Sequence, residues 1–200
     1  EGICNTTPCI TVEVWVHSIS SITQGVMGTT SDTICVGQST TLSLSGSTLG
    51  TNADWYWYTL SCGGNGAGIG TTLVDNPVST TTYYVRAEGL CNTTTCQSIE
   101  ITVNTNSTGT ITAIASPDTI CEGSNTNLMI TGGQLGTGGD WYWYSGGCGQ
   151  TLETVGSIVS VTPVATMVYY VRAEGVCNTT NCELIFVTVK TNSLRATTIT

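Results

Sequence analysis

Residues 54–58 of the sequence read DWYWY, and this stretch decides the fold. The same five letters return at residues 140–144, a step of 86 residues. Other landmarks keep this step: Cys35 to Cys121, Cys62 to Cys148, Tyr83 to Tyr169, Arg86 to Arg172, Cys91 to Cys177 and Cys96 to Cys182. A fixed period of this length indicates a tandem array of small domains, each with one aromatic strand that can nucleate a core.

Composition favours an ordered all-β chain. Hydrophobic residues make up 40% of the sequence and charged residues only 8%, which is too apolar for a disordered chain and too poor in charge for an ordinary cytosolic protein. Threonine occurs 40 times, and together with Val and Ile this β-branched excess favours strands over helices.

The formal net charge of −9 excludes two classes of partner. Nucleic-acid binding needs a basic patch, and attraction to anionic lipid needs basic residues, of which the chain has four. No apolar run approaches the ~20 residues that span a bilayer, so direct membrane insertion is not expected. The start at Glu1 is expected to be that of a mature product or of a slice of a longer protein.

Ten regularly spaced cysteines favour structural disulfides and an oxidising compartment. Zinc is the competing interpretation, but the single histidine, His17, lies outside the repeat pattern. No Cys-x-x-Cys occurs, so a redox role has no support. Neither a metal site nor a cofactor is predicted.

The repeat pattern divides the chain. Residues 1–9 (EGICNTTPC) match residues 88–96 (EGLCNTTTC) and 174–182 (EGVCNTTNC), and an alternating apolar strand follows each. We therefore predict residues 1–17 to be the last hairpin of a preceding repeat, residues 18–103 and 104–189 to be complete repeats, and residues 190–200 to begin a following one. The first segment either continues the same polymer or completes a neighbouring chain.

Within each repeat the pattern predicts about seven short strands. Period-two alternation and frequent turn signals, with no helical periodicity, indicate an antiparallel β-sandwich. Residues 63–70 are rich in glycine and are predicted to form a turn.

The sequence also resembles a known family. Residues 33–39 (TICVGQS), 57–58 (WY), 82–85 (TYYV) and 89–91 (GLC) resemble the immunoglobulin-like repeat of Bacteroidota surface proteins. Such repeats build long cell-surface proteins exported by the type IX system, including gliding-motility adhesins. The resemblance implies tandem immunoglobulin-like sandwiches, with Trp57 and Trp55 in the core.

The resemblance also implies a disulfide pattern by proximity at the two poles of the sandwich. The pairs it favours are Cys35–Cys62, Cys91–Cys96, Cys121–Cys148 and Cys177–Cys182, with Cys4–Cys9 as a self-contained pair. The second cysteine pair of each repeat exceeds what the simplest family members are expected to have, so the pairing stays open.

If the tryptophans face inward, an aromatic and arginine face points outward. Its members are Tyr56, Tyr58, Tyr84 and Arg86 in the first repeat and Tyr142, Tyr144, Tyr170 and Arg172 in the second. One interpretation is cross-strand pairing with the arginine stacked on a tyrosine. The other is a platform for sugar rings or a neighbouring filament.

Carbohydrate attachment is a further hypothesis. Asn5, Asn92, Asn106 and Asn178 each begin an N-x-[ST] pattern. Thr33 and Thr119 stand in Asp-Thr-Ile contexts that resemble the acceptor used by Bacteroidota for O-glycosylation; a strand-end turn is the plain alternative.

Catalysis is not predicted. No Ser/His/Asp set repeats, and the acidic pair Asp54 and Glu88 (Asp140 and Glu174 in the second repeat) is too few oxygens for a strong calcium site. We expect an extracellular structural stalk or filament segment of a bacterial adhesin whose partners are adjacent repeats. The alternatives are a glycan- or protein-binding module and an accessory array on a secreted hydrolase.

Overall fold

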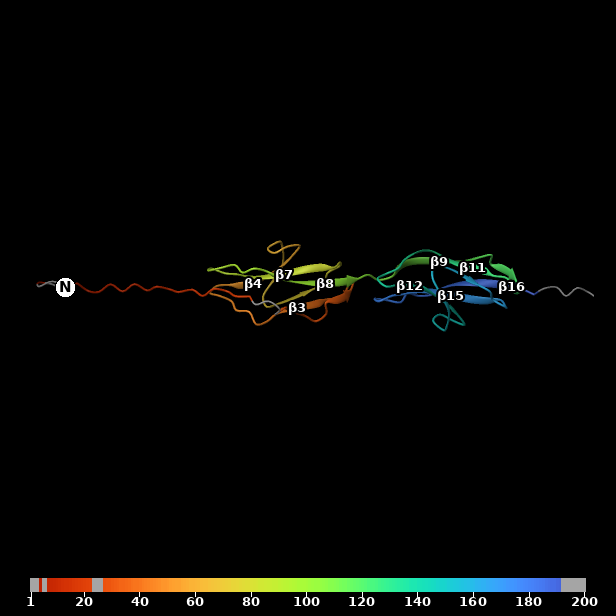
Figure 1. The fold of residues 1–200 in the computed structure, drawn as a ribbon, viewed down its shortest axis with the longest axis horizontal. Coiled ribbons are helices and arrows are strands. Elements are labelled where there is room, and N and C mark those ends of the chain that lie inside the picture. Colours follow the sequence, from red (N-terminus) through yellow and green to blue (C-terminus); the bar gives the residue numbers. More distant parts are fainter. Residues whose placement is uncertain (1–3, 5–6, 23–26, 192–200) are drawn as a thin grey trace, which may run out of the picture. The chain divides into compact units, whose positions relative to one another are not determined.

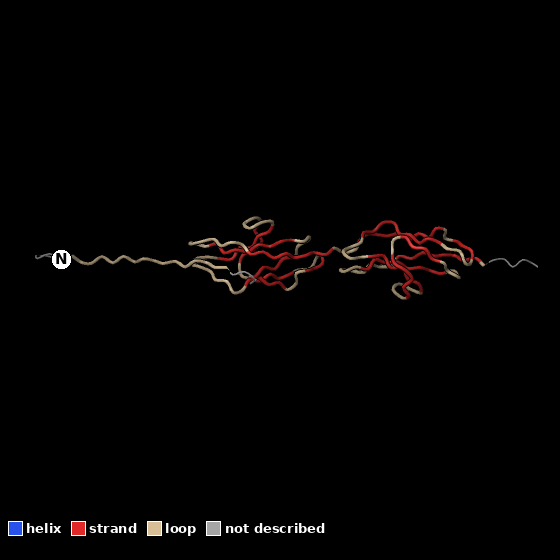
Figure 2. Tube along the Cα trace, in the orientation of Figure 1, coloured by secondary structure: helices blue, strands red, loops and turns tan. Residues whose placement is uncertain are grey.

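The computed structural model describes Cys4, residues 7–22 and residues 27–191. All regular structure in these residues is β-strand (Figure 2), so the described part of the chain holds no helix that could cross a membrane. The first repeat contains β1 (Met27–Thr29), β2 (Thr33–Cys35), β3 (Thr40–Leu44), β4 (Asp54–Thr59), β5 (Asn65–Ile69), β6 (Thr72–Asp75), β7 (Thr81–Glu88) and β8 (Gln97–Asn104). The second contains β9 (Thr108–Ser116), β10 (Thr119–Cys121), β11 (Thr126–Gln134), β12 (Asp140–Ser145), β13 (Thr151–Val155), β14 (Ile158–Val161), β15 (Met167–Glu174) and β16 (Glu183–Lys190).

The strands form two immunoglobulin-like sandwiches, as predicted. In the first repeat a three-stranded sheet (β1-β3-β6) lies across from a five-stranded sheet (β2-β8-β7-β4-β5) (Figure 1). The second repeat has the same arrangement, with β14-β11-β9 facing β10-β16-β15-β12-β13. The opening strand of each five-stranded sheet pairs in parallel with the final strand, and every other pairing is antiparallel.

Each sandwich closes around its aromatic strand. Trp55 and Trp57 are 3% and 0% exposed, and they lie opposite Ala87 and Val85 of β7, which are also buried. The Trp57 indole N–H donates to the carbonyl of Gly70 at 2.8 Å, and the same bond recurs in the second repeat. The prediction that both tryptophans face inward is confirmed.

The glycine-rich residues 65–69 form strand β5, where the sequence predicted a turn. β5 pairs with β4 at the sheet edge, and Gly68 lies over Leu73 so closely that a Cβ would stand 2.7 Å from its Cδ1. A larger residue at position 68 would therefore have to displace the end of the Leu73 side chain, and glycine here favours close approach between the sheets rather than a turn.

Contacts divide the described residues into two compact units. The first holds Ser39–Asn76 and Thr80–Ile101 with the described residues before Thr33, and the second holds Thr33–Gln38, Pro77–Ser79 and the described residues from Thr102 onward. The strip Thr33–Gln38, which carries β2 and Cys35, thus makes its contacts within the second unit. The repeat boundaries at residues 17, 103 and 189 stay predictions. Val12, Val14 and Val16 are 81–90% exposed and form no strand among the described residues.

Candidate functional site

Three disulfides organise the chain. Cys62–Cys96 and Cys148–Cys182 are equivalent bonds in the two repeats, each with a sequence separation of 34. The third joins Cys35 of the first repeat to Cys177 of the second, with a separation of 142. Both of its cysteines lie in the second compact unit.

The predicted pairing is wrong in every bond. Cys35–Cys62 and Cys91–Cys96 fail because Cys62 pairs with Cys96, and Cys121–Cys148 and Cys177–Cys182 fail because Cys148 pairs with Cys182. Cys4–Cys9 is also wrong: Cys4, Cys9, Cys91 and Cys121 are free and exposed.

The reason lies in the strand order. Cys35 ends β2 at one edge of its sheet, whereas Cys62 follows β4, with β8 and β7 in between. Cys62 follows β4 and Cys96 precedes β8, and these two strands lie on either side of β7. The Cys62–Cys96 bond therefore crosses the outer face of β7. Arg86 on β7 lies against it, with its Nη1 donating to Cys62 Sγ at 3.8 Å.

Residues 104–107, which lead from β8 to β9, are held at both ends. At the first end the Val36 N–H donates to the carbonyl of Asn104 at 2.9 Å. At the other end the Asn178 side chain binds the backbone of Ser107 twice, accepting from its N–H at 2.8 Å and donating to its carbonyl at 2.9 Å. Cys35 precedes Val36 and Cys177 precedes Asn178, so the two clamps bring the two cysteines together.

Two further contacts fix the same segment. The Thr105 N–H donates to Thr137 Oγ1 at 2.9 Å, and the Gly136 N–H donates to Ser107 Oγ at 2.9 Å. A Cβ on Gly136 would collide with the Thr105 carbonyl and stand 2.5 Å from Ser107 N. Glycine is therefore needed at position 136 so that the segment can lie against its loop.

The first repeat holds the segment that precedes it, around residues 18–20, with an equivalent clamp. Asn92 binds the Ser20 backbone at 2.8 and 2.9 Å, and the Ser18 N–H donates to Thr51 Oγ1 at 3.0 Å. Gly50 is the equivalent of Gly136, and its N–H donates to Ser20 Oγ at 2.9 Å. The sequence predicted Asn92 and Asn178 as glycosylation candidates; the structure shows their amides in use as backbone clamps.

Replacing Asn178 by alanine is expected to destabilise the second sandwich by about 1–3 kcal/mol, because it leaves buried backbone groups of Ser107 unpaired. Ser107 is only 3% exposed. Urea unfolding followed by circular dichroism measures the change, and Asn106→Ala, at an exposed position in the same segment, is the matched control. Equal midpoints for the two variants would contradict the clamp.

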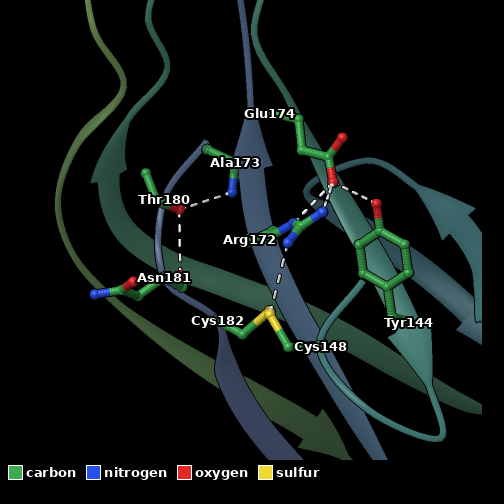
Figure 3. Close-up of polar contacts among 8 residues, drawn as sticks. All are labelled: Tyr144, Cys148, Arg172, Ala173, Glu174, Thr180, Asn181 and Cys182. Atoms are coloured by element: carbon green, nitrogen blue, oxygen red, sulfur yellow. Dashed lines mark hydrogen bonds and ion pairs between the residues drawn. A yellow bond between two sulfur atoms is a disulfide. The ribbon is translucent and has the colours of Figure 1, made fainter. Parts of the chain in front are cut away.

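A second cluster occupies the predicted outer face (Figure 3). In the second repeat Arg172 binds Glu174 Oε1 through Nε at 2.8 Å and Nη2 at 2.7 Å, and the Tyr144 hydroxyl donates to the same oxygen. The Arg172 guanidinium carbon lies 5.2 Å from the centroid of the Tyr144 ring and its Nη1 reaches Cys148 Sγ at 3.8 Å. Tyr58, Arg86 and Glu88 repeat this arrangement in the first repeat.

The cluster shifts the titration of its members. Hydrogen bonds from Tyr58 and then Arg86 lower the pKa of Glu88, and Glu88 in turn raises the pKa of Arg86. Burial, followed by the bond to Glu88, raises the pKa of Tyr58. The cluster therefore holds a carboxylate, a guanidinium and a neutral phenol together beside the disulfide.

We expect Glu88→Gln with Glu174→Gln to lower stability at neutral pH, with the loss shrinking in acid. A lowered carboxyl pKa contributes stability above the ordinary value of about 4.3, and this contribution disappears as pH falls through the lowered pKa. Urea unfolding at pH ~7 and below about pH 3 tests this. Glu100→Gln, at an exposed position, is the control, and a stability gap that does not change with pH would refute the assignment.

The remaining predicted residues fall into two groups. Tyr56, Tyr84, Tyr142 and Tyr170 are half-buried on the outer sheet face, where Tyr56 lies opposite Arg86 and Tyr58 opposite Tyr84. Thr33, Thr119 and Asn106 are exposed, and Asn5 lies outside the described residues. The hydroxyls of Thr94 and Thr180, the third residues of two N-x-T patterns, accept from backbone N–H groups at 3.0 Å.

A shallow groove of about 400 Å³ lies in the second unit between the start of β9 and residues 180–183. Trp141 forms part of its wall, and Glu183 is the one charged residue among those that line it. Small-molecule sites usually gather several convergent polar groups in an apolar cleft. Only Ile111 and Trp141 among the residues that line this groove are large and apolar, so it lacks the apolar lining of such a site. The disulfide framework and its clamps are therefore the features with a function to explain.

Comparison with known proteins agrees with the fold. Residues 23–104 match the family model described as an Ig-like domain, CHU_C associated, which fits the surface repeat that the sequence resembles. No curated protein matches the sequence. In a crystal structure of a mouse coronavirus receptor-binding domain with its murine receptor, one chain is similar with a TM-score of 0.57 and 12% identity, over 82% of this chain and 100% of that one.

Two further structures are similar at lower scores. Murine CEACAM1b has a TM-score of 0.48 at 12% identity, over 84% of this chain and 99% of that one. The amphioxus IgVJ-C2 molecule has a TM-score of 0.46 at 13% identity, over 78% and 99%. At such identities the likeness concerns the fold alone.

Proposed function

We propose, from the premise that residues 23–104 belong to the CHU_C-associated Ig-like domains, that the chain is a load-bearing segment of a long extracellular bacterial surface protein. In this role it is a stalk or filament segment of an adhesin, not an enzyme, and its partners are adjacent repeats. The function is mechanical: it holds an active tip or a neighbouring filament at a distance from the cell.

The Cys35–Cys177 disulfide is the observation that carries this proposal. It ties one repeat covalently to the next and closes a loop across 142 positions. A bond within one sandwich would stabilise that sandwich alone. A bond that joins successive repeats also lets tension pass along the array without unfolding the strands between its cysteines.

The surface chemistry supports the same role. Cys62–Cys96 and Cys148–Cys182 staple each sandwich internally, as is typical of proteins in oxidising compartments. Thr33, Thr119 and Asn106 are exposed and are the positions at which we expect glycans. The amides of Asn92 and Asn178 are engaged in the clamps and are weaker acceptors.

Electron microscopy of the native, unreduced parent protein on the cells that make it tests the proposal. An antibody against the second repeat should label long fibres outside the cell. Cells from which these repeats are deleted are the control and should lose the labelled fibres. Label confined to the cell interior, or on compact particles, would refute the stalk role.

A binding module is the second candidate, favoured by the half-buried tyrosines on the outer sheet face of each repeat, Tyr56 and Tyr84 in the first and Tyr142 and Tyr170 in the second. The hydroxyls of Tyr58 and Tyr144 are already bound to Glu88 and Glu174, which leaves fewer groups for a ligand. Retention on a glycan array of the native chain, lost on Tyr56→Ser with Tyr142→Ser, would support this candidate. No retention, or retention unchanged by the variants, would reject it.

A further inference from the structure

We infer that the Cys35–Cys177 disulfide is one member of a series in which the opening-strand cysteine of each repeat pairs with the loop cysteine of the next. In this series Cys121 binds the loop cysteine of a following repeat, and Cys91 binds the opening-strand cysteine of a preceding one. The partner is another repeat of this same kind. The inference rests on the proposed function only in requiring that the array continues.

Cys121 is presented in the same way as Cys35. Cys35 ends β2 opposite Asn104, the last residue of β8, and Cys121 ends β10 opposite Lys190, the last residue of β16. The next N–H in each case bonds to that last residue, from Val36 at 2.9 Å and from Glu122 at 3.0 Å. The thiol of Cys121 therefore stands where the following segment leaves the sandwich, and it is free and exposed.

The segment that follows repeats in sequence as well. Residues 105–107, which the second repeat clamps, read TNS, and residues 191–193 also read TNS. The groups that clamp the first of these are Asn178, Thr137 and Gly136. A further repeat with the same groups would hold the second TNS and set its loop cysteine beside Cys121.

Cys91 occupies the receiving position in the first repeat. Cys91 lies in a turn that is closed by a hydrogen bond from the Gly89 N–H to the Asn92 carbonyl at 3.0 Å. Cys177 lies in an equivalent turn, which the Gly175 N–H closes by donating to the Asn178 carbonyl at 3.0 Å. The neighbouring Asn92 already clamps Ser20 as Asn178 clamps Ser107. The turn and the Asn92 clamp that would hold a preceding repeat are therefore already formed, and the Cys91 thiol beside them is free and exposed.

The bond forms by thiol–disulfide exchange. The Cys121 thiol and the loop thiol of the next repeat each give up one proton and one electron as their S–S bond forms. A small disulfide oxidant such as glutathione disulfide takes up both electrons and both protons and leaves as two thiols. The exposed position of Cys121 gives such an oxidant access.

The series would make the array resistant to cleavage. The loop closed by Cys35–Cys177 contains Cys121, so a bond from Cys121 to a following repeat begins inside that loop and ends beyond it. Successive loops therefore overlap. A single cut in the backbone anywhere within the series leaves the two sides covalently joined.

The test uses the full chain with one repeat added, by placing a copy of residues 105–190 directly after Lys190. The protein is oxidised with glutathione disulfide, its remaining thiols are blocked with N-ethylmaleimide, and its disulfide-linked peptides are identified by mass spectrometry. The unextended chain is the reference, in which Cys121 is labelled. Cys121→Ser in the extended chain is the matched control, in which the added copy of Cys177 becomes labelled.

In the extended chain we expect loss of label at Cys121 and a peptide that links it to the added copy of Cys177. Label retained at Cys121 while the Cys35–Cys177 peptide is present would overturn this inference and leave the proposed function standing. Absence of both linked peptides would overturn the series and also remove the observation on which the load-bearing role depends.

Discussion

Pulled from its two ends, the oxidised chain is expected to extend by less than a third of the length that it reaches after full reduction. The Cys35–Cys177 bond removes 142 positions from the stretched path, and at about 3.5 Å per residue these amount to roughly 500 Å. Cys62, Cys96 and Cys148 all lie within the loop that the Cys35–Cys177 bond closes. The Cys62–Cys96 and Cys148–Cys182 bonds therefore do not shorten the stretched path further.

The double variant Cys35→Ser with Cys177→Ser should give an intermediate length. Loss of the Cys35–Cys177 bond returns 142 positions to the stretched path, but each of the two remaining disulfides then removes 34 positions from it, 68 in all. The stretched path therefore gains 142 minus 68, or 74 positions. This corresponds to roughly 260 Å of added contour length.

Single-molecule force spectroscopy at a load that unfolds both sandwiches distinguishes these three lengths. Cys91→Ser with Cys121→Ser removes two free cysteines and should leave the oxidised length unchanged. A double variant at positions 35 and 177 with the native extension would show that this bond carries no load.

Replacing Trp57 by alanine is expected to cost about 3–5 kcal/mol, the usual range for a buried tryptophan. The side chain is 0% exposed and its indole N–H bonds to Gly70. A loss of this size is a large fraction of the ~5–15 kcal/mol that stabilises a typical domain. Trp143→Ala in the second repeat, also 0% exposed, should cost the same.

Urea unfolding followed by circular dichroism measures this loss without relying on the deleted fluorophore. Trp15→Ala is the matched control, because Trp15 is 77% exposed and its loss should change stability by less than ~0.5 kcal/mol. A Trp57→Ala midpoint as high as that of Trp15→Ala would show that the aromatic strand does not organise the core.

Much of the fold could be predicted because it depends on local pattern. Alternation within DWYWY places Trp55 and Trp57 on one face of the strand. The resemblance to the immunoglobulin-like repeat identified that face as the inward one, and the burial of both side chains confirms it. The step of 86 residues predicted equivalent sandwiches. The strand β5 was missed because its glycines were interpreted as a turn signal, whereas Gly68 lies within the strand and against Leu73.

The disulfides could not be predicted because they depend on strand order. Sequence does not show that β2 pairs in parallel with β8, which sets Cys35 beside Asn104 and away from Cys62. The signal that was missed is a Cys-Asn pair that recurs together with a serine. In the second repeat Asn178, next to Cys177, clamps Ser107, and in the first repeat Asn92, next to Cys91, clamps Ser20. Read as glycosylation patterns, these asparagines concealed the clamp.

Mass-spectrometric mapping of the oxidised, unextended chain tests the central claim most directly. Thiols are blocked at acidic pH before digestion, so that the bonds cannot exchange. We predict a disulfide-linked peptide that joins Cys35 to Cys177 together with labelled Cys91 and Cys121. A peptide that joins Cys35 to Cys62 would mean that each repeat closes on itself, and it would contradict the account.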